Sequence, residues 1–115
     1  MIPAPGEPNF EERRRSVRVD TPLDAIYSCA ASPPIRARIQ DLSEHGVFLD
    51  THHPLQIGAP VELEFGLPDG EDPIRIKGHV SWSAPMMGSG VEFEDLDEAT
   101  RERIKFFVAQ VFFGS

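Results

Sequence analysis

The sequence has very little cysteine and no long apolar run, and both absences narrow what it can encode. Cys29 is the only cysteine among 115 residues, so no disulfide can form within the chain, which fits a reducing compartment. No segment approaches the roughly 18 consecutive apolar residues that a membrane-spanning helix needs. The proline-rich residues 1–9 also lack the apolar core of a secretory signal. We therefore expect a cytoplasmic protein without membrane insertion.

Positive charge is scarce as well. Eleven lysines and arginines stand against 19 aspartates and glutamates, which gives a formal net charge of -8. A surface this acidic repels a nucleic-acid backbone, so DNA and RNA are not expected partners. The arginines are nevertheless concentrated, because Arg13, Arg14, Arg15 and Arg18 fall within one short segment. A local cationic site on an acidic protein suits a small anion better than a long polymer.

Local motifs for catalysis and for tightly bound cofactors are missing. The sequence contains no GxSxG, P-loop or HExxH pattern. His45, His52 and His53 suit a solvated loop better than a metal site, because adjacent histidines on a strand point to opposite faces. Cys29 lies in a predicted strand with nothing nearby to activate it, which favours core packing. We expect no enzyme, no metal and no cofactor.

The body of the chain alternates between short apolar segments and turns, which favours an all-β fold. Ile35, Ala37 and Ile39, for example, alternate with polar residues at the period of a half-buried strand. The predicted strands are residues 24–30, 35–40, 47–49, 61–65, 74–82 and 91–93. Many short strands at this spacing favour a small barrel, since closure removes exposed edges.

Two residues of the 74–82 segment interrupt or end its pattern. Gly78 interrupts the apolar side and marks either a bulge or a close approach of two backbones. Trp82, the only tryptophan, is expected in the core rather than as a platform for a stacked base. Were it instead near a ligand site, its fluorescence would report binding.

The end of the chain changes to helical spacing. Asp97 suits the N-cap position of a terminal helix. The apolar stripe that recurs at helical spacing comprises Ile104, Phe107, Val108, Val111 and Phe112. Phe106 and Phe113 fall on the opposite face of this helix. Two interpretations stay open: the helix end frays or bends into the core, or the two rings form an exposed patch for dimerisation or an effector protein.

Two short motifs carry the functional signal. The first is an RxxxR pattern from Arg14 to Arg18, and the second is a DxSxxG pattern from Asp41 to Gly46. Arginine forms paired hydrogen bonds with phosphate and stacks on bases, while aspartate accepts from the N–H donors of guanine. Each motif alone is common, as a solvated tail or as a turn before a strand. Their occurrence together, in this order and with a predicted strand between them, is more specific.

With these motifs the sequence resembles the PilZ domain, the bacterial receptor domain for cyclic di-GMP. The resemblance extends from Glu11 to Phe113 and rests on four segments: residues 12–18, 41–49, 90–93 and the terminal helix. It implies a six-stranded antiparallel β-barrel with a C-terminal α-helix over residues 11–115. The composition of residues 1–10 indicates a flexible tail, or alternatively a linker.

The resemblance also implies a site and a role. Arg14 and Arg18 would hold the phosphates and stack on guanine, and Asp41, Ser43 and Gly46 would recognise guanine. Arginine at position 13 favours two stacked ligands for each domain. The implied function is a cyclic di-GMP receptor that signals to a protein effector or works as a homodimer. The alternative is a PilZ-like adaptor that binds proteins without nucleotide.

Overall fold

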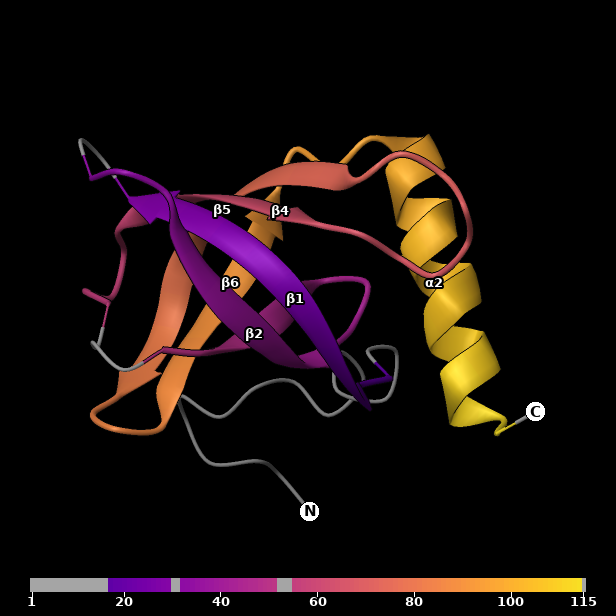
Figure 1. Cartoon of the computed structure of the whole chain (residues 1–115), viewed down its shortest axis with the longest axis horizontal. Coiled ribbons are helices and arrows are strands. Elements are labelled where there is room, and N and C mark those ends of the chain that lie inside the picture. Colours follow the sequence, from indigo (N-terminus) through magenta and orange to yellow (C-terminus); the bar gives the residue numbers. More distant parts are fainter. Residues whose placement is uncertain (1–16, 30–31, 52–54, 115) are drawn as a thin grey trace, which may run out of the picture.

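The computed structural model describes residues 17–29, 32–51 and 55–114, which form a barrel and a helix. The elements are β1 (Val19–Cys29), β2 (Ile35–Leu42), β3 (Gly46–Asp50), β4 (Pro60–Phe65), β5 (Ile74–Ala84), β6 (Gly88–Glu94) and α2 (Glu98–Phe112). Neighbouring strands pair antiparallel in the order β1-β2-β3-β6-β5-β4, and β4 also pairs with β1, which closes the barrel. Helix α2 lies along one side of it (Figure 1). The predicted six-stranded antiparallel β-barrel with a C-terminal helix is confirmed.

Strand β1 is longer than the sequence indicated. It begins at Val19 rather than at residue 24. The added part contains Pro22, which cannot donate a ladder hydrogen bond. The structure accommodates this proline at an irregularity, since the register of β1 against β2 shifts between Asp20 and Leu23. This extension brings the start of β1, directly after Arg18, alongside the end of β2.

The core fills the inside of the barrel with aliphatic side chains that alternate along the strands. Cys29 is partly buried and packs against this cluster, as expected for a structural cysteine. The members with the least exposure are Ile39, Leu42, Val47, Leu49, Val61, Phe65, Ile74, Val80, Val91 and, from the helix, Ile104.

Strand β5 contains both features that its glycine suggested, but at different residues. At Gly78 the backbones approach closely, because a Cβ there would overlap the carbonyl oxygen of Glu92. The bulge lies further along, where the register against β6 shifts between Val80 and Trp82. A bulge reverses the side on which the following residues point. Trp82 is therefore 46% exposed on the outer face, and its predicted place in the core is wrong.

Helix α2 begins as the sequence predicted. The carboxylate of Asp97 accepts a hydrogen bond from the backbone N–H of Thr100 at 2.7 Å, which caps the first turn. Ile104 and Val108 are buried against the barrel. Arg103 fixes the helix to the β4–β5 loop, because its guanidinium donates to both carboxylate oxygens of Asp69 at 3.1 Å.

The last turn of α2 departs from the predicted apolar stripe. Phe112 is 59% exposed, so its predicted place on the buried side is wrong. The residues that face this turn from the barrel are Val17 and Glu44. Together with Phe112 and Phe113 they line a cavity of about 190 Å³, so they do not cover the two rings. The rings of Phe112 and Phe113 contact each other edge to face, with centroids 5.2 Å apart.

We expect Gly78→Ala to destabilise the protein by more than about 2 kcal/mol, because the added methyl group must displace the backbone of β6. Gly66→Ala is the matched control, since nothing lies within 4 Å of a Cβ at Gly66. Urea denaturation of both variants measures the difference. Equal midpoints for the two variants would contradict the close packing of β5 on β6.

Candidate ligand-binding site

The two sequence motifs meet on the outer face of the barrel at an ion pair. The register of β2 against β3 shifts between Ile39 and Asp41. This bulge turns Asp41 outward although Ile39 and Leu42 both point into the core. The guanidinium of Arg18 donates to the carboxylate of Asp41 at 2.8 Å. One charged group from each motif is thus held in direct contact.

Asp41 sits in a partly buried and electrostatically mixed position. Burial raises the pKa of its carboxyl above the usual range and is the largest influence. The Arg18 cation lowers this pKa, while the carboxylate of Asp20, which is the register partner of Asp41 on β1, raises it again. Burial outweighs the ion pair in the balance. The carboxylate is therefore only partly compensated, and it retains capacity to accept further hydrogen bonds.

Ser43 builds the turn that follows Asp41. Its hydroxyl oxygen accepts from the backbone N–H groups of His45 and Gly46, at 3.1 and 3.2 Å. The Ser43 N–H donates in turn to the Gly46 carbonyl at 2.9 Å. The side chain is almost fully buried. Ser43 thus shapes the turn beside Asp41, and its predicted contact with a ligand stays a prediction.

Gly46 allows this turn to lie directly against β6. A Cβ at this position would overlap the carbonyl oxygen of Val91. The backbone N–H of Phe93 donates to the carbonyl of His45 at 2.8 Å and ties the turn to the same strand. The glycine is therefore required by packing, and direct contact with a ligand is a separate prediction.

An aromatic pair lies next to Asp41 on the outer face. The register runs Asp41 to Phe48, Phe48 to Gly90 and Gly90 to Trp82, so these residues form one row across β2, β3, β6 and β5. Gly90 has no side chain to separate its neighbours, and the rings of Phe48 and Trp82 approach to a centroid distance of 5.6 Å. The row combines a carboxylate with an apolar, π-rich surface.

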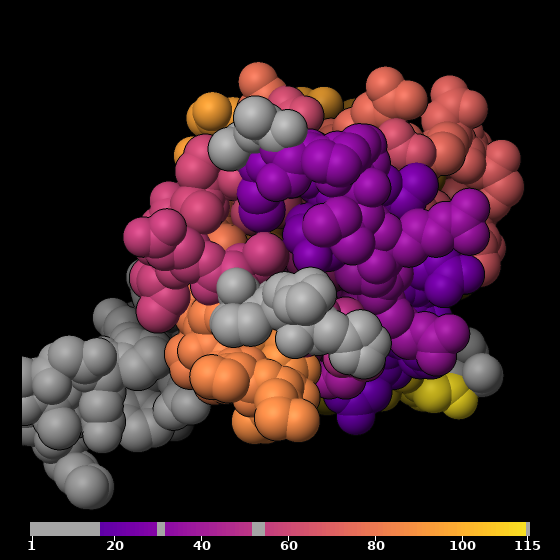
Figure 2. Space-filling view, turned by 60° about the vertical axis from the view of Figure 1, so that its left-hand side comes forward, coloured from indigo at the N-terminus to yellow at the C-terminus, as the bar shows by residue number. Residues whose placement is uncertain are grey.

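This row forms the floor of a hollow of about 440 Å³. The tip of the β5–β6 hairpin (orange in Figure 2) lies close to the residues of β2 (purple) and forms one side of it. The lining residues are Gln40, Asp41, Phe48, Asp50, Trp82, Met86 and Met87. Among the described residues that line it, two are carboxylates and none is lysine or arginine. Cations for an anionic ligand must therefore come from its edge, where Arg18 lies.

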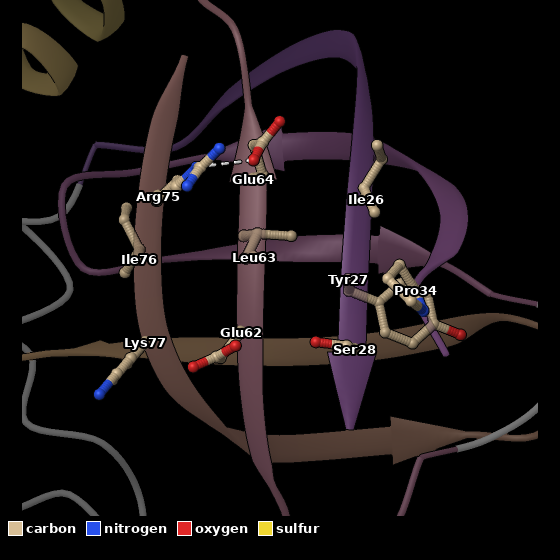
Figure 3. A pocket seen from close by; sticks show the side chains of 10 residues that line it. All are labelled: Ile26, Tyr27, Ser28, Pro34, Glu62, Leu63, Glu64, Arg75, Ile76 and Lys77. Atoms are coloured by element: carbon tan, nitrogen blue, oxygen red, sulfur yellow. Dashed lines mark hydrogen bonds and ion pairs between the residues drawn. The ribbon is translucent and has the colours of Figure 1, made fainter. Parts of the chain in front are cut away.

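A second hollow, of about 520 Å³, occupies the opposite part of the barrel wall over β1, β4 and β5 (Figure 3). Glu62 and Glu64 stand at its centre, between side chains of β1 and of β5. Arg75 is already paired with Glu64 at 2.8 Å. Lys77 also lines this hollow, so its two carboxylates are balanced by two cations, and neither sequence motif contributes a described residue to its lining.

The structure brings Arg18, Asp41, Ser43 and Gly46 together, as the motifs predicted. Arg13 and Arg14 lie outside the described residues. Sequence reasoning missed Phe48, Gly90 and the two methionines of the hairpin. The hairpin did carry a signal, because Met86 and Met87 are two consecutive apolar residues between two predicted strands.

Comparison with known proteins identifies the family. The sequence matches the PilZ domain family over residues 12–110. The chain belongs to the PilZ domain family. No curated protein sequence matches it.

Solved structures of low sequence identity share the fold of this PilZ domain. The inhibitor of motility MotI/DgrA from Bacillus subtilis matches with a TM-score of 0.72 and 19% identity over 90% of the chain. The chain corresponds to 53% of the length of MotI. The PilZ domain of YcgR from Escherichia coli, solved with c-di-GMP, matches with a TM-score of 0.69 and 16% identity, covering 88% of this chain and 92% of that one.

A third structure, the PilZ domain of CeSA from a cellulose-synthesizing bacterium, matches with a TM-score of 0.59 and 19% identity. The alignment covers 84% of this chain and 95% of that domain. Within the described part of this PilZ domain, no helix is long and apolar enough to span a membrane. No group of metal-binding side chains occurs among the same residues.

We expect Asp41→Asn to raise the free energy of unfolding near pH 7. The pKa of the Asp41 carboxyl is higher in the folded protein than in the unfolded chain. Its favourable contribution to stability is therefore present at pH values below the pKa of the unfolded chain, and it is lost as the pH rises through the pKa of the folded protein. The advantage of the variant should shrink as the pH falls toward about 3. Urea denaturation at both pH values measures it. A less stable variant near pH 7 would show that the Arg18 pair outweighs burial.

Proposed function

We propose that this PilZ domain is a cytoplasmic receptor for cyclic di-GMP and does no chemistry on it. The observation that carries the proposal is the contact of Arg18 with Asp41 beside an open hollow with an aromatic floor. The similar fold of the YcgR domain, which was solved with c-di-GMP, supports the choice of ligand. Arginine, aspartate and stacking groups suffice for recognition, so we expect binding without a metal or other cofactor.

The ion pair suggests how the ligand enters. In the free protein Arg18 and Asp41 neutralise each other at 2.8 Å. A cyclic dinucleotide offers a phosphate to the guanidinium and guanine N–H donors to the carboxylate. Binding therefore exchanges one charge-assisted contact for two, and neither charge is left without a partner.

The remaining arginines of the first motif complete the cationic side of the site in this proposal. Arg14, four residues before Arg18 in the sequence, would hold a phosphate and stack on a base. Arg13 would do the same for a second ligand, which favours two stacked dinucleotides in each site. The arginine segment folds over the ligand on binding, and fixing this segment lowers the affinity by the entropy of its ordering.

Phe48 and Trp82 supply the surface for a base. Both rings lie in the same row as Asp41. Guanine held at the Asp41 carboxylate can extend over this pair. Stacking of a base on an aromatic side chain contributes about 1–3 kcal/mol. This arrangement makes Trp82 a base platform in our proposal.

The occupied site is coupled to the end of α2 through shared walls. Val17 lies inside the first motif and Glu44 inside the second, and both line the cavity next to Phe112 and Phe113. A ligand that moves the first motif changes this cavity. The end of α2 is therefore the surface that passes the signal to a protein partner. The transmitted free energy cannot exceed the difference in ligand affinity between the two states.

Calorimetric titration with cyclic di-GMP tests the receptor function. We expect saturable binding that persists in EDTA, with a molar ratio of two ligands for each chain. Arg18→Ala and Asp41→Ala should each weaken binding about 10- to 100-fold, because each removes a charged partner of the ligand. Arg14→Ala should act in the same direction.

The matched control is a second ion pair on the outer face of the barrel. Arg75 and Glu64 also lie 2.8 Å apart but line the other hollow. Arg75→Ala and Glu64→Ala should bind the ligand like the unmodified protein. No binding by the folded protein would overturn the receptor function. It would favour the nucleotide-independent adaptor, for which the exposed Phe106 and Phe113 are the supporting observation.

Trp82 fluorescence provides an independent prediction, because no other tryptophan contributes to the signal. Cyclic di-GMP should change its intensity in proportion to saturation, since the base contacts the indole. Trp82→Ala should weaken binding about 5- to 100-fold. Binding of normal affinity in this variant, or unchanged fluorescence at saturation, would exclude the base platform.

A further inference from the structure

The outward face of α2 carries two large apolar side chains that the barrel does not cover. Phe106 is 68% and Phe113 78% exposed. By helical spacing both rings fall opposite the buried Ile104 and Val108, and Phe113, the C-cap residue, also borders the cavity beside Val17 and Glu44. Of the two interpretations left open by the sequence, this exposure favours the patch, and its use as an interface stays a prediction. The neighbouring Phe112 packs its ring edge to face on that of Phe113.

These side chains form a seam with the spacing of a helix-pairing surface. The seam comprises Glu102, Phe106, Ala109 and Phe113, which follow one another at intervals of four, three and four residues. They fall within about 60° of each other around the helix axis. Such spacing is typical of the a and d positions through which two helices pack. The small Ala109 between two large rings allows a facing helix to approach closely.

The seam is complementary to itself when a second copy runs antiparallel. A two-fold axis near Ala109 places Phe106 of one copy against Phe113 of the other, and the same contact recurs on the other side of the axis. The two Ala109 residues then face each other across it. The backbone supports this extent, because Phe113 still donates its N–H to the carbonyl of Ala109 at 3.0 Å.

The size of the seam sets the strength of the contact. Covering Phe106 and Phe113 removes on the order of 300 Å² from water in each copy, since a phenylalanine buries roughly 150–250 Å². Both copies together reach only about half of the roughly 1,200 Å² at the lower end of stable interfaces. The association is therefore weak and depends on concentration.

The charges that border the seam do not favour a cationic partner over a second copy of the chain. Lys105 lies 3.9 Å from Glu102, so the border of the seam is locally balanced. The whole chain, however, carries a net charge of -8. Two copies repel each other at long range, and added salt screens this repulsion without weakening an apolar contact.

We propose that the outward face of α2 is a dimer interface at which two copies of this chain pack antiparallel through Phe106, Ala109 and Phe113. This interface goes beyond the nucleotide-binding function and does not depend on it. It joins two chains at the surface to which the ligand site is coupled.

Sedimentation velocity of the full chain tests the interface. We expect the average mass to rise from one chain toward two with increasing concentration, and to rise further with added salt. The double variant Phe106→Glu, Phe113→Glu should stay at the mass of one chain. The control Ile57→Glu changes another exposed apolar side chain, in the turn before β4, and should behave like the unmodified protein.

Oxidative cross-linking tests the antiparallel geometry. In a Cys29→Ser background, Ala109→Cys should form a disulfide-linked dimer, because the two positions face each other at the axis. The control Glu98→Cys, at the start of the same helix, should not. A single-chain mass at every concentration would overturn the interface, as would mass that falls with salt. Equal cross-linking from positions 98 and 109 would overturn the antiparallel packing.

Discussion

Successive side chains of a β-strand point to opposite faces, so a regular β2 that buries Ile39 would also bury Asp41. An aspartate inside this aliphatic barrel would lose its solvation without gaining a partner. The bulge between Ile39 and Asp41 removes this conflict by turning the carboxylate outward. The bulge in β5 does the same for Trp82. Each bulge inserts one extra residue into its strand. The outward positions of Asp41 and Trp82 depend on these two insertions.

The closed barrel then determines which outward residues meet. Since β6 lies between β3 and β5, residues far apart in the chain become neighbours in one row, from Asp41 through Phe48 and Gly90 to Trp82. Glycines make the row compact, because Gly46 lets the turn rest on β6 and Gly90 leaves the two rings in contact. A rigid wall of this kind holds its recognition groups in place before a ligand arrives, which reduces the ordering that binding requires.

The sequence was sufficient for the fold and for the contact between the two motifs, and insufficient for the hollow beside them. Alternation and turn residues mark the strands, and Asp97 marks the start of the helix. Periodicity failed at Trp82 because a bulge moves one residue and reverses all that follow, and nothing in the residue types near Ser81 signals it. Phe112 was placed wrongly for a different reason. Helical spacing identifies a face, but only the position of the barrel decides how far along the helix that face is covered.

The acidity of the chain explains why an anion site should be divided between two segments. The described lining of the hollow contains Asp41 and Asp50 and no lysine or arginine, so the wall alone repels phosphate. In the free protein Arg18 compensates Asp41 at the edge of the hollow. An anionic ligand becomes favourable only when the arginine segment supplies more positive charge than the wall opposes. In the proposed receptor the ligand would therefore bind this segment, which continues into Val17 at the cavity beside the end of α2. A receptor that works as proposed would report occupancy through its arginines rather than through the barrel.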